Sequence, residues 1–130
     1  GLVGSEMCIR DSINLLNGPD ETLLCGLVMG ADGGIGSTYN IMPGIYKKIY
    51  GAFREGDMKS ARNWQFQADN IIEVLLKYGQ IRAMKFLFNR KGISLGKAEK
   101  PAVDLSDGEE QQLLCELEAA GYFREYPEMK

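Results

Sequence analysis

The 130-residue chain contains no histidine, which removes the commonest general base and a frequent metal ligand from its chemistry. Its three cysteines, Cys8, Cys25 and Cys115, show neither the CxxC spacing of a metal or redox site nor a disulfide framework. We therefore expect no metal site and no nucleophile activated by histidine. Cys25 and Cys115 are expected to be small apolar core residues, and the cysteine pattern fits a reducing cytoplasm.

Long hydrophobic runs and an excess of positive charge are also missing. The nearest apolar stretch, residues 23–29, is far too short to cross a bilayer, and residues 1–7 lack the basic region of a signal peptide. The net charge is −3, and the lysines and arginines are spread among acidic residues, so no basic stripe is available for nucleic acid. A cytoplasmic protein with neither a membrane nor a nucleic-acid partner is expected.

The first half of the chain repeats a pattern of strand, loop and helix. Residues 13–17 form a short apolar run that ends in Asn-Gly, after which Asp20 can cap a helix. The small, glycine-rich residues 31–37 favour a second strand and loop, and a helix follows from Pro43 to Gly56. The apolar face of the first helix is expected to consist of Leu23, Leu24, Leu27 and Val28.

The second half of the chain shows only helical patterns. Asp57 caps a helix that runs to about residue 77, and the Ser106 capping box starts a last helix after a loop at residues 93–105. Between them a shorter helix stops before Gly92. The residues expected to face inward on these helices are Trp64, Ala68, Ile71, Ile72, Leu75, Leu76, Ile81, Met84, Leu87, Phe88, Leu113, Leu114 and Leu117.

Two units of strand, loop and helix cannot form a domain alone, because parallel strands are covered on both faces and need neighbours. The pattern instead resembles the end of an eight-stranded barrel, whose sites lie on the loops that follow the strands. We therefore predict an α/β fold, the C-terminal part of a (β/α)8 TIM barrel. Residues 13–56 are expected to supply about the last two βα units, and residues 57–130 a C-terminal helical region of the same domain.

Two segments carry a resemblance to a known family. Residues 17–21, Asn-Gly-Pro-Asp-Glu, resemble the loop after the seventh strand of the N-acetylneuraminate lyases. Residues 30–40, Gly-Ala-Asp-Gly-Gly-Ile-Gly-Ser-Thr-Tyr-Asn, resemble the loop after the eighth. These lyases are sialic acid aldolases of the dihydrodipicolinate synthase superfamily. The resemblance implies a homotetrameric Schiff-base enzyme that needs no cofactor and cleaves N-acetylneuraminate to pyruvate and N-acetylmannosamine.

The resemblance also implies which residues hold the open-chain polyol of the sugar acid. Carboxylates accept hydrogen bonds from sugar hydroxyls, a serine both donates and accepts, and a glycine lets the backbone approach the ligand closely. Pro19 stands where the family commonly has an aromatic residue, so the preference among sialic acids stays open. The substrate-binding residues that the resemblance implies are Gly18, Asp20, Glu21, Gly36 and Ser37.

No catalytic residue is expected among these 130 residues. The family's imine-forming lysine, its tyrosine and its carboxylate-binding loop precede the segments that match. None of the nine lysines present lies in a sequence context that predicts the burial or the cationic neighbour that a nucleophilic lysine needs. Residues 7–12 match a peptide encoded by a transposon adapter used in sequencing libraries, so we expect residues 1–12 to be an artefact and the chain to be a piece of a longer lyase.

Alternatives from other classes remain open at this point. The chain could belong to another pyruvate aldolase resembling dihydrodipicolinate synthase, or it could be a phosphate-binding module that cradles an anion at residues 33–37. It could also be a non-enzymatic helical protein that binds a partner through residues 64–76. Because the expected strands lack neighbours, the isolated chain should aggregate or be molten.

Overall fold

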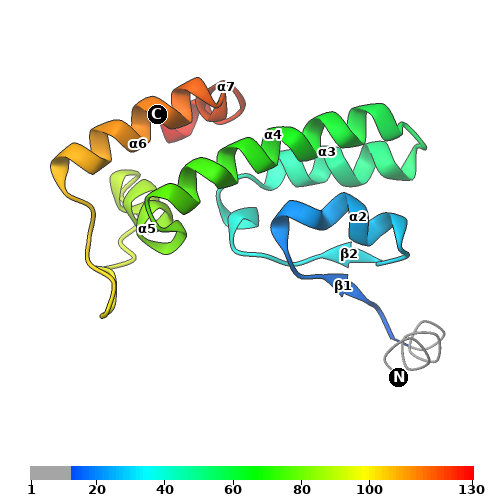
Figure 1. The fold of residues 1–130 in the computed structure, drawn as a ribbon, viewed down its shortest axis with the longest axis horizontal. Helices are drawn as coiled ribbons and strands as arrows, with labels where there is room; N and C mark the ends of the chain where they lie inside the picture. Colours follow the sequence, from blue (N-terminus) through cyan, green and yellow to red (C-terminus); the bar gives the residue numbers. More distant parts are fainter. Residues whose placement is uncertain (1–12) are drawn as a thin grey trace. The chain divides into compact units, whose positions relative to one another are not determined.

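The computed structural model describes residues 13–130, so the expectation for residues 1–12 falls outside the described part of the chain. The chain divides into two compact units, Gly1–Gln65 and Phe66–Lys130, and helix α4 contributes to both. The elements are β1 (Leu16–Asn17), η1 (Asp20–Thr22), α2 (Leu23–Val28), β2 (Gly33–Gly34), η2 (Thr38–Asn40), α3 (Pro43–Arg54), α4 (Met58–Lys77), α5 (Gln80–Arg90), α6 (Asp107–Ala119), α7 (Tyr122–Glu125) and η3 (Pro127–Met129) (Figure 1).

The first unit contains a small parallel sheet whose two strands are joined by α2. Leu16 of β1 pairs with Gly33 of β2, and Asn17 pairs with Gly34. The backbone N–H of Ile35 extends the ladder by donating to the carbonyl oxygen of Asn17 at 2.9 Å. Figure 1 shows α2 lying along the strands, which is the arrangement of a βα unit. Both strands predicted from the sequence are present, although each pairs over only two residues.

Helix α3 follows the second strand and begins at Pro43, where a missing backbone N–H removes no helical hydrogen bond. It ends before Gly56, whose φ of +79° is the left-handed conformation that commonly stops a helix. Asp57 then accepts a hydrogen bond from the backbone N–H of Ser60 at 3.0 Å, so the predicted cap of α4 is confirmed. The apolar residues buried in this unit are Leu23, Leu24, Leu27, Ile41, Met42, Ile45, Tyr46, Ile49 and Ala61.

The second unit is built from the end of α4 together with α5, α6 and α7. The predicted capping box of α6 is confirmed, because the Ser106 side chain accepts from the Glu109 N–H and the Glu109 carboxylate accepts from the Ser106 N–H. Helix α7 was not predicted, and it starts after Gly121, which has a φ of +80°. The apolar core of this unit consists of Ala68, Ile71, Ile72, Leu75, Tyr78, Ala83, Met84, Leu87, Leu105, Leu113, Leu117, Tyr122, Phe123 and Tyr126.

Several predictions of buried side chains are wrong. Cys25 and Cys115 are both exposed free thiols rather than core residues. Val28, Leu76 and Ile81 belong to the expected apolar faces, yet each is more than half exposed. Helical periodicity shows which residues share a face, but the width of the buried stripe depends on the neighbouring elements that cover it. On α2, α4 and α5 that stripe is narrower than the sequence pattern indicates.

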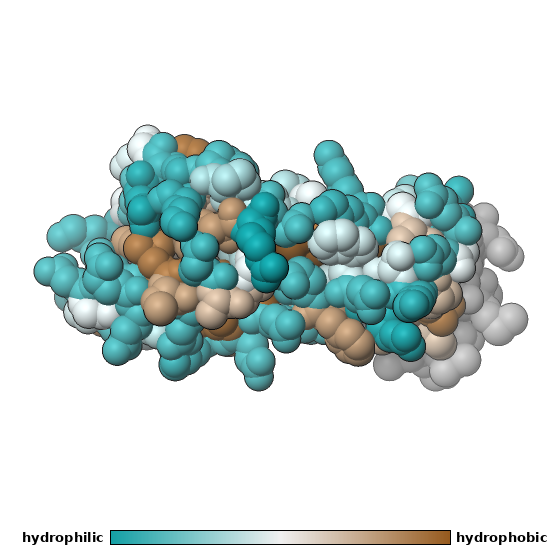
Figure 2. Space-filling view, turned by 90° about the horizontal axis from the view of Figure 1, so that it is seen from above, coloured by the Kyte–Doolittle hydropathy of each residue, from teal (hydrophilic) through white to brown (hydrophobic). Residues whose placement is uncertain are grey.

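The surface is therefore mixed in character. Figure 2 shows hydrophobic side chains, in brown, breaking a surface that is otherwise hydrophilic. Around the small sheet, Ile13, Leu16 and Ile35 are exposed large apolar residues. No helix within residues 13–130 combines the length and apolar character needed to cross a membrane.

Candidate functional site

The five residues predicted to bind substrate lie on two loops, one after each strand of the small sheet. Gly18, Asp20 and Glu21 follow β1, and Gly36 and Ser37 follow β2. Because the strands are parallel, their carboxyl ends lie at the same edge of the sheet, and the two loops emerge there together. The fold therefore places both predicted segments at one edge.

Asp20 joins the two loops through its side chain. It is 7% exposed, and its Oδ2 accepts hydrogen bonds from the backbone N–H of Thr38 at 3.0 Å and from the Thr38 hydroxyl at 2.6 Å. The Thr38 hydroxyl also lies 2.5 Å from the Tyr46 hydroxyl on α3. A buried carboxylate needs such partners, since burial without hydrogen bonds is costly. The prediction that Asp20 caps the first helix is wrong, because its carboxylate binds the second loop instead.

Gly36 of the second loop packs closely against the Asp20 side chain of the first. A Cβ atom at this position would lie 1.5 Å from Oδ1 of Asp20, which is far inside van der Waals contact. The residue must therefore be glycine for steric reasons if the Asp20 carboxylate is to keep its place. Oδ2 is occupied by Thr38, while Oδ1 faces the Gly36 backbone.

A glutamine on α4 holds the first loop from the other side. Gln65 is buried, and its Oε1 accepts from the backbone N–H of Leu24 at 2.9 Å. Its Nε2 donates to the carbonyl oxygen of Asp20 at 3.2 Å. The start of α2 therefore obtains from a distant helix the hydrogen bond that a side-chain cap would otherwise supply.

Two stacked tyrosines line a small cavity beside the second loop. The rings of Tyr39 and Tyr46 are 3.8 Å apart and almost parallel, and they border a cavity of about 310 Å³. The Tyr39 hydroxyl is buried and has no hydrogen-bond partner among the described residues. Burial, assisted by the negative charge of Asp20, raises the pKa of Tyr39 to about 12.

The other predicted residues face solvent. Gly18, Glu21 and Ser37 are exposed, and within residues 13–130 the Glu21 carboxylate makes no hydrogen bond or ion pair. An exposed carboxylate beside a serine loop can accept hydrogen bonds from the hydroxyls of a polar ligand. Asp20 and Gly36 are in contact, whereas Glu21 and Gly18 are exposed to solvent.

The described residues give little support to a mechanism that uses a lysine nucleophile or a metal ion. Eight of the nine lysines are exposed, and the half-buried one, Lys85, donates to the Lys97 carbonyl oxygen at 2.7 Å. None of them has the buried environment that lowers the pKa of a lysine toward neutrality. Within residues 13–130, no three His, Cys, Asp or Glu side chains gather closely enough to hold a metal ion.

Comparison with known proteins assigns the chain to a family. The model of the dihydrodipicolinate synthetase family matches residues 4–120. The chain belongs to this family. Within the family, the chain is similar to N-acetylneuraminate lyases. The lyase of Salmonella agona (strain SL483) is 40% identical over 94 residues, which cover 72% of this chain and 32% of that protein.

Two further relatives agree with this placement. The N-acetylneuraminate lyase of Salmonella paratyphi B is 49% identical over 71 residues, covering 55% of this chain and 24% of that protein. The structure of Proteus mirabilis N-acetylneuraminate lyase superposes with a TM-score of 0.77 at 29% identity, covering 88% of this chain and 40% of that one. The chain thus spans about a quarter to a third of the length of these curated relatives.

Some of the residues that shape the site were not found from the sequence. Thr38 carries two hydrogen bonds to Asp20, and Gln65 fixes the first loop from 45 residues away in the chain. Thr38 lies within the matching segment and could have been singled out as a hydroxyl beside Ser37. Gln65 gives no local signal, because a glutamine in a polar helix is ordinarily exposed.

Proposed function

We propose that this chain is the C-terminal part of a longer N-acetylneuraminate lyase. In that protein, residues 13–56 would form the last two βα units of a (β/α)8 barrel, and residues 57–130 the helical region of the same domain. The observation that carries the proposal is the placement of both lyase-like loops at one sheet edge, joined by the Asp20–Thr38 hydrogen bonds. Barrel enzymes of this kind place their sites at that edge.

The two loops would hold the polyol part of the sugar acid. Glu21 is the exposed acid of the pair, so it would accept hydrogen bonds from substrate hydroxyls, together with the Ser37 side chain. The backbones of Gly18 and Gly36 would contribute contacts that need no side chain. Asp20 would mainly hold the second loop in place, because Oδ2 is already occupied by Thr38 and only Oδ1 remains for a ligand.

The chemistry itself would come from outside this chain. In the longer protein a lysine would form an imine with the ketone carbon of the substrate and release water. The imine would then accept the electron pair of the cleaved carbon–carbon bond, giving N-acetylmannosamine and, after hydrolysis, pyruvate. The residues described here would bind and orient the polyol, and the exposure of their lysines supports that division of roles. A homotetramer in the cytoplasm is part of the same proposal.

A second candidate is another pyruvate aldolase of the same family. Pro19 favours it, because this residue has a fixed backbone angle and no aromatic ring at the position beside the two acids. Such a change in the wall of the polyol site alters which hydroxyl groups of a substrate the loop residues can contact. The reaction would remain a retro-aldol cleavage that releases pyruvate, and the partner aldehyde would differ.

The phosphate-binding alternative loses support in this geometry. Within residues 33–37 the backbone N–H of Ile35 already donates to the Asn17 carbonyl oxygen, and just after this segment the N–H of Thr38 donates to the Asp20 carboxylate. A buried negative charge next to residues 33–37 also repels a phosphate.

The test starts from the source DNA, sequenced in long reads across the codons for residues 1–17. If an open reading frame continues upstream, the longer protein is expressed and assayed for release of pyruvate from N-acetylneuraminate. Cleavage of N-acetylneuraminate supports the lyase, whereas release of pyruvate only from another 2-keto sugar acid supports the second candidate. Absence of both activities would overturn the proposal.

Glu21→Gln tests the role of the loop within that protein. We expect the KM for N-acetylneuraminate to rise about tenfold, because a charged hydrogen bond to a sugar hydroxyl is replaced by a neutral one. Borohydride trapping of the imine with pyruvate alone should stay unchanged, since pyruvate has no polyol. Glu55→Gln, an exposed acid after α3, is the matched control and should change neither value.

A further inference from the structure

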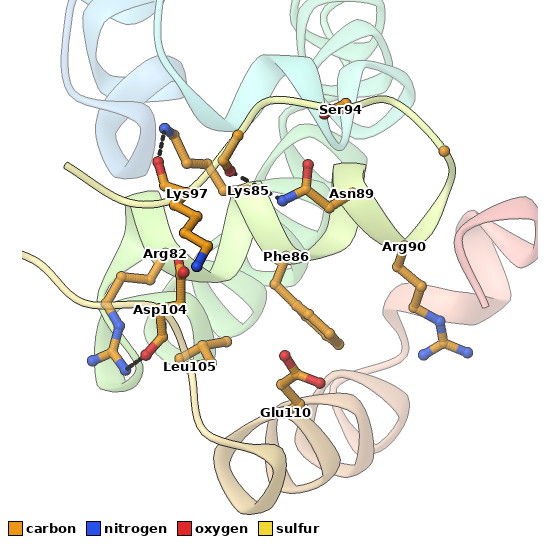
Figure 3. Close-up of a pocket in the computed structure, with 12 residues that line it drawn as sticks. Arg82, Lys85, Phe86, Asn89, Arg90, Ser94, Lys97, Asp104, Leu105 and Glu110 are labelled. Carbon is orange, nitrogen blue, oxygen red and sulfur yellow. Dashed lines mark hydrogen bonds between the residues drawn. The ribbon is translucent and has the colours of Figure 1, made fainter.

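A second cavity, of about 640 Å³, lies in the unit Phe66–Lys130 between α5, the loop that follows it and α6 (Figure 3). Pockets for small ligands usually measure roughly 300–1,000 Å³. None of the residues that line this cavity belongs to the two loops described above. The ligand of this cavity is therefore independent of the proposed lyase function.

The lining carries an excess of positive charge. The chain as a whole has a net charge of −3, so this concentration of cations is a local feature. A cavity with such an excess favours a negatively charged ligand, because its walls focus the field on the enclosed space. The charged residues of the lining are the cations Arg82, Lys85, Arg90 and Lys97 and the acids Asp104 and Glu110.

Some of the cations hold the walls together. Arg82 donates to the Glu109 carboxylate at 3.2 Å and to the Asp104 carbonyl oxygen at 3.2 Å. Lys85 donates to the carbonyl oxygen of Lys97 at 2.7 Å, which anchors the loop to α5. These hydrogen bonds hold both the loop and the start of α6 against α5, so the cavity is already formed without a ligand.

Two donors at this cavity lack an acceptor. Within residues 13–130, the Lys97 ammonium group makes no hydrogen bond or ion pair. Arg82 Nε is buried and also has no hydrogen-bond partner in the described part of the chain. Arg82 Nε exposes almost no surface, so a ligand in the cavity cannot reach it, whereas the exposed Lys97 ammonium group can donate to an anion there.

The third feature of the cavity is an apolar surface. The Phe86 side chain extends from α5 toward α6, and the Glu110 carboxylate points toward it from α6 (Figure 3). Leu105, which is 9% exposed, adds a second apolar contact.

We propose that this cavity binds a small organic anion. Its carboxylate or phosphate group would lie near the Lys97 ammonium group, and an apolar body of about the size of a phenyl ring would lie against Phe86.

The first experiment measures binding to the full chain by isothermal titration calorimetry, with sodium benzoate, phenyl phosphate and benzyl alcohol as probes. We expect saturable binding of at least one anion at millimolar concentration or below, and at least tenfold weaker binding of benzyl alcohol. The anion that binds more tightly identifies whether the site prefers a carboxylate or a phosphate group. If neither anion binds, or if benzyl alcohol binds as well as they do, the proposal is overturned.

Variants then locate the site. Lys97→Met should weaken binding of the preferred anion about tenfold, since a charge-assisted hydrogen bond is lost. Lys91→Met is the matched control, because Lys91 is an exposed lysine beside the same loop that does not line the cavity. Equal affinities for these two variants would contradict the assignment. Far-UV circular dichroism checks that each variant is folded.

Glu110→Gln provides an independent test that removes no cation. The Glu110 carboxylate faces the cavity and repels an anion, so its neutralisation should strengthen anion binding severalfold (Figure 3). Equal or weaker binding of the preferred anion to Glu110→Gln would show that this carboxylate does not face the bound anion, and would overturn the proposal. Loss of lyase activity in the longer protein has no bearing on either outcome, because the polyol loops lie in the other unit.

Discussion

At the scale of single residues, the position of the Asp20 carboxylate is decided by groups that are distant in the chain. Thr38 supplies both hydrogen bonds to Oδ2, and the lack of a side chain at Gly36 leaves room for Oδ1. Glu21, the next residue in the chain, is exposed. Two adjacent acids therefore have different surroundings, and only Glu21 is fully available to a ligand in solution.

Gly36→Ala is expected to destabilise the first unit by about 2–3 kcal/mol, because the new Cβ would displace the Asp20 carboxylate and leave buried donors of Thr38 without an acceptor. Urea unfolding followed by circular dichroism measures the change. Gly18→Ala is the matched control, since a Cβ there meets nothing within 4 Å. The urea midpoint of this variant should equal that of the parent chain within error. Equal midpoints for the two variants would show that the Asp20 contact contributes nothing.

At the scale of elements, α6 shows how a local signal and a tertiary contact combine. Ser106 and Glu109 form the capping box that the sequence predicts, and Arg82 of α5 then donates to the same carboxylate. Hydrogen bonds from Ser106, followed by the charge of Arg82, hold the pKa of Glu109 below its ordinary value of 4.5. The stabilisation from this carboxylate is therefore present above about pH 4.5 and is lost as the pH falls below that value.

Ser106→Ala should lower the free energy of unfolding by about 1 kcal/mol at neutral pH, because α6 loses its side-chain cap. The pKa of Glu109 should also rise toward its ordinary value, so the variant loses less additional stability than the parent on acidification. Urea midpoints near pH 7 and near pH 4 measure both effects. Ser106→Thr keeps the hydroxyl group and should behave like the parent. If its urea midpoints at both pH values instead equal those of Ser106→Ala, the hydroxyl does not act as a helix cap.

At the scale of the whole molecule, each unit has a buried core, but within residues 13–130 the face of the small sheet that carries Leu16 and Ile35 is left uncovered. Leu16 is 52% exposed and Ile35 is 65% exposed, and both lie at or beside a two-stranded parallel sheet. Parallel sheets are ordinarily covered on both faces, and open strand edges with apolar side chains favour association with other chains. The chain alone is therefore expected to self-associate through this sheet.

Leu16→Lys and Ile35→Lys together should reduce self-association, because charge on exposed strand positions opposes pairing of edges. Light scattering after size-exclusion chromatography, at several concentrations, gives the mass of each variant. Val103→Lys is the matched control, since Val103 is 67% exposed but lies in the loop before α6. A monomeric parent chain, or an equal reduction in the control, would refute a role for the sheet.

The amino-acid sequence by itself determined where most helices begin and end. Pro43, Gly56, Asp57 and the Ser106 capping box act within a few residues of their own position, so their effect does not depend on the rest of the fold. The resemblance of the two loops to lyase loops was equally readable, because it rests on the order of residues alone. The short helix α7 was missed, since four residues carry too little periodicity to be recognised.

Only the tertiary structure decided which side chains are buried and what they contact. Asp20 meets Thr38 18 residues away, and Gln65 reaches Asp20 from 45 residues away. Conversely, the sequence predicted that Cys25 and Cys115 are buried, whereas both thiols are exposed in the fold. Burial depends on which elements cover a face, and that is a property of packing between distant segments rather than of any local pattern.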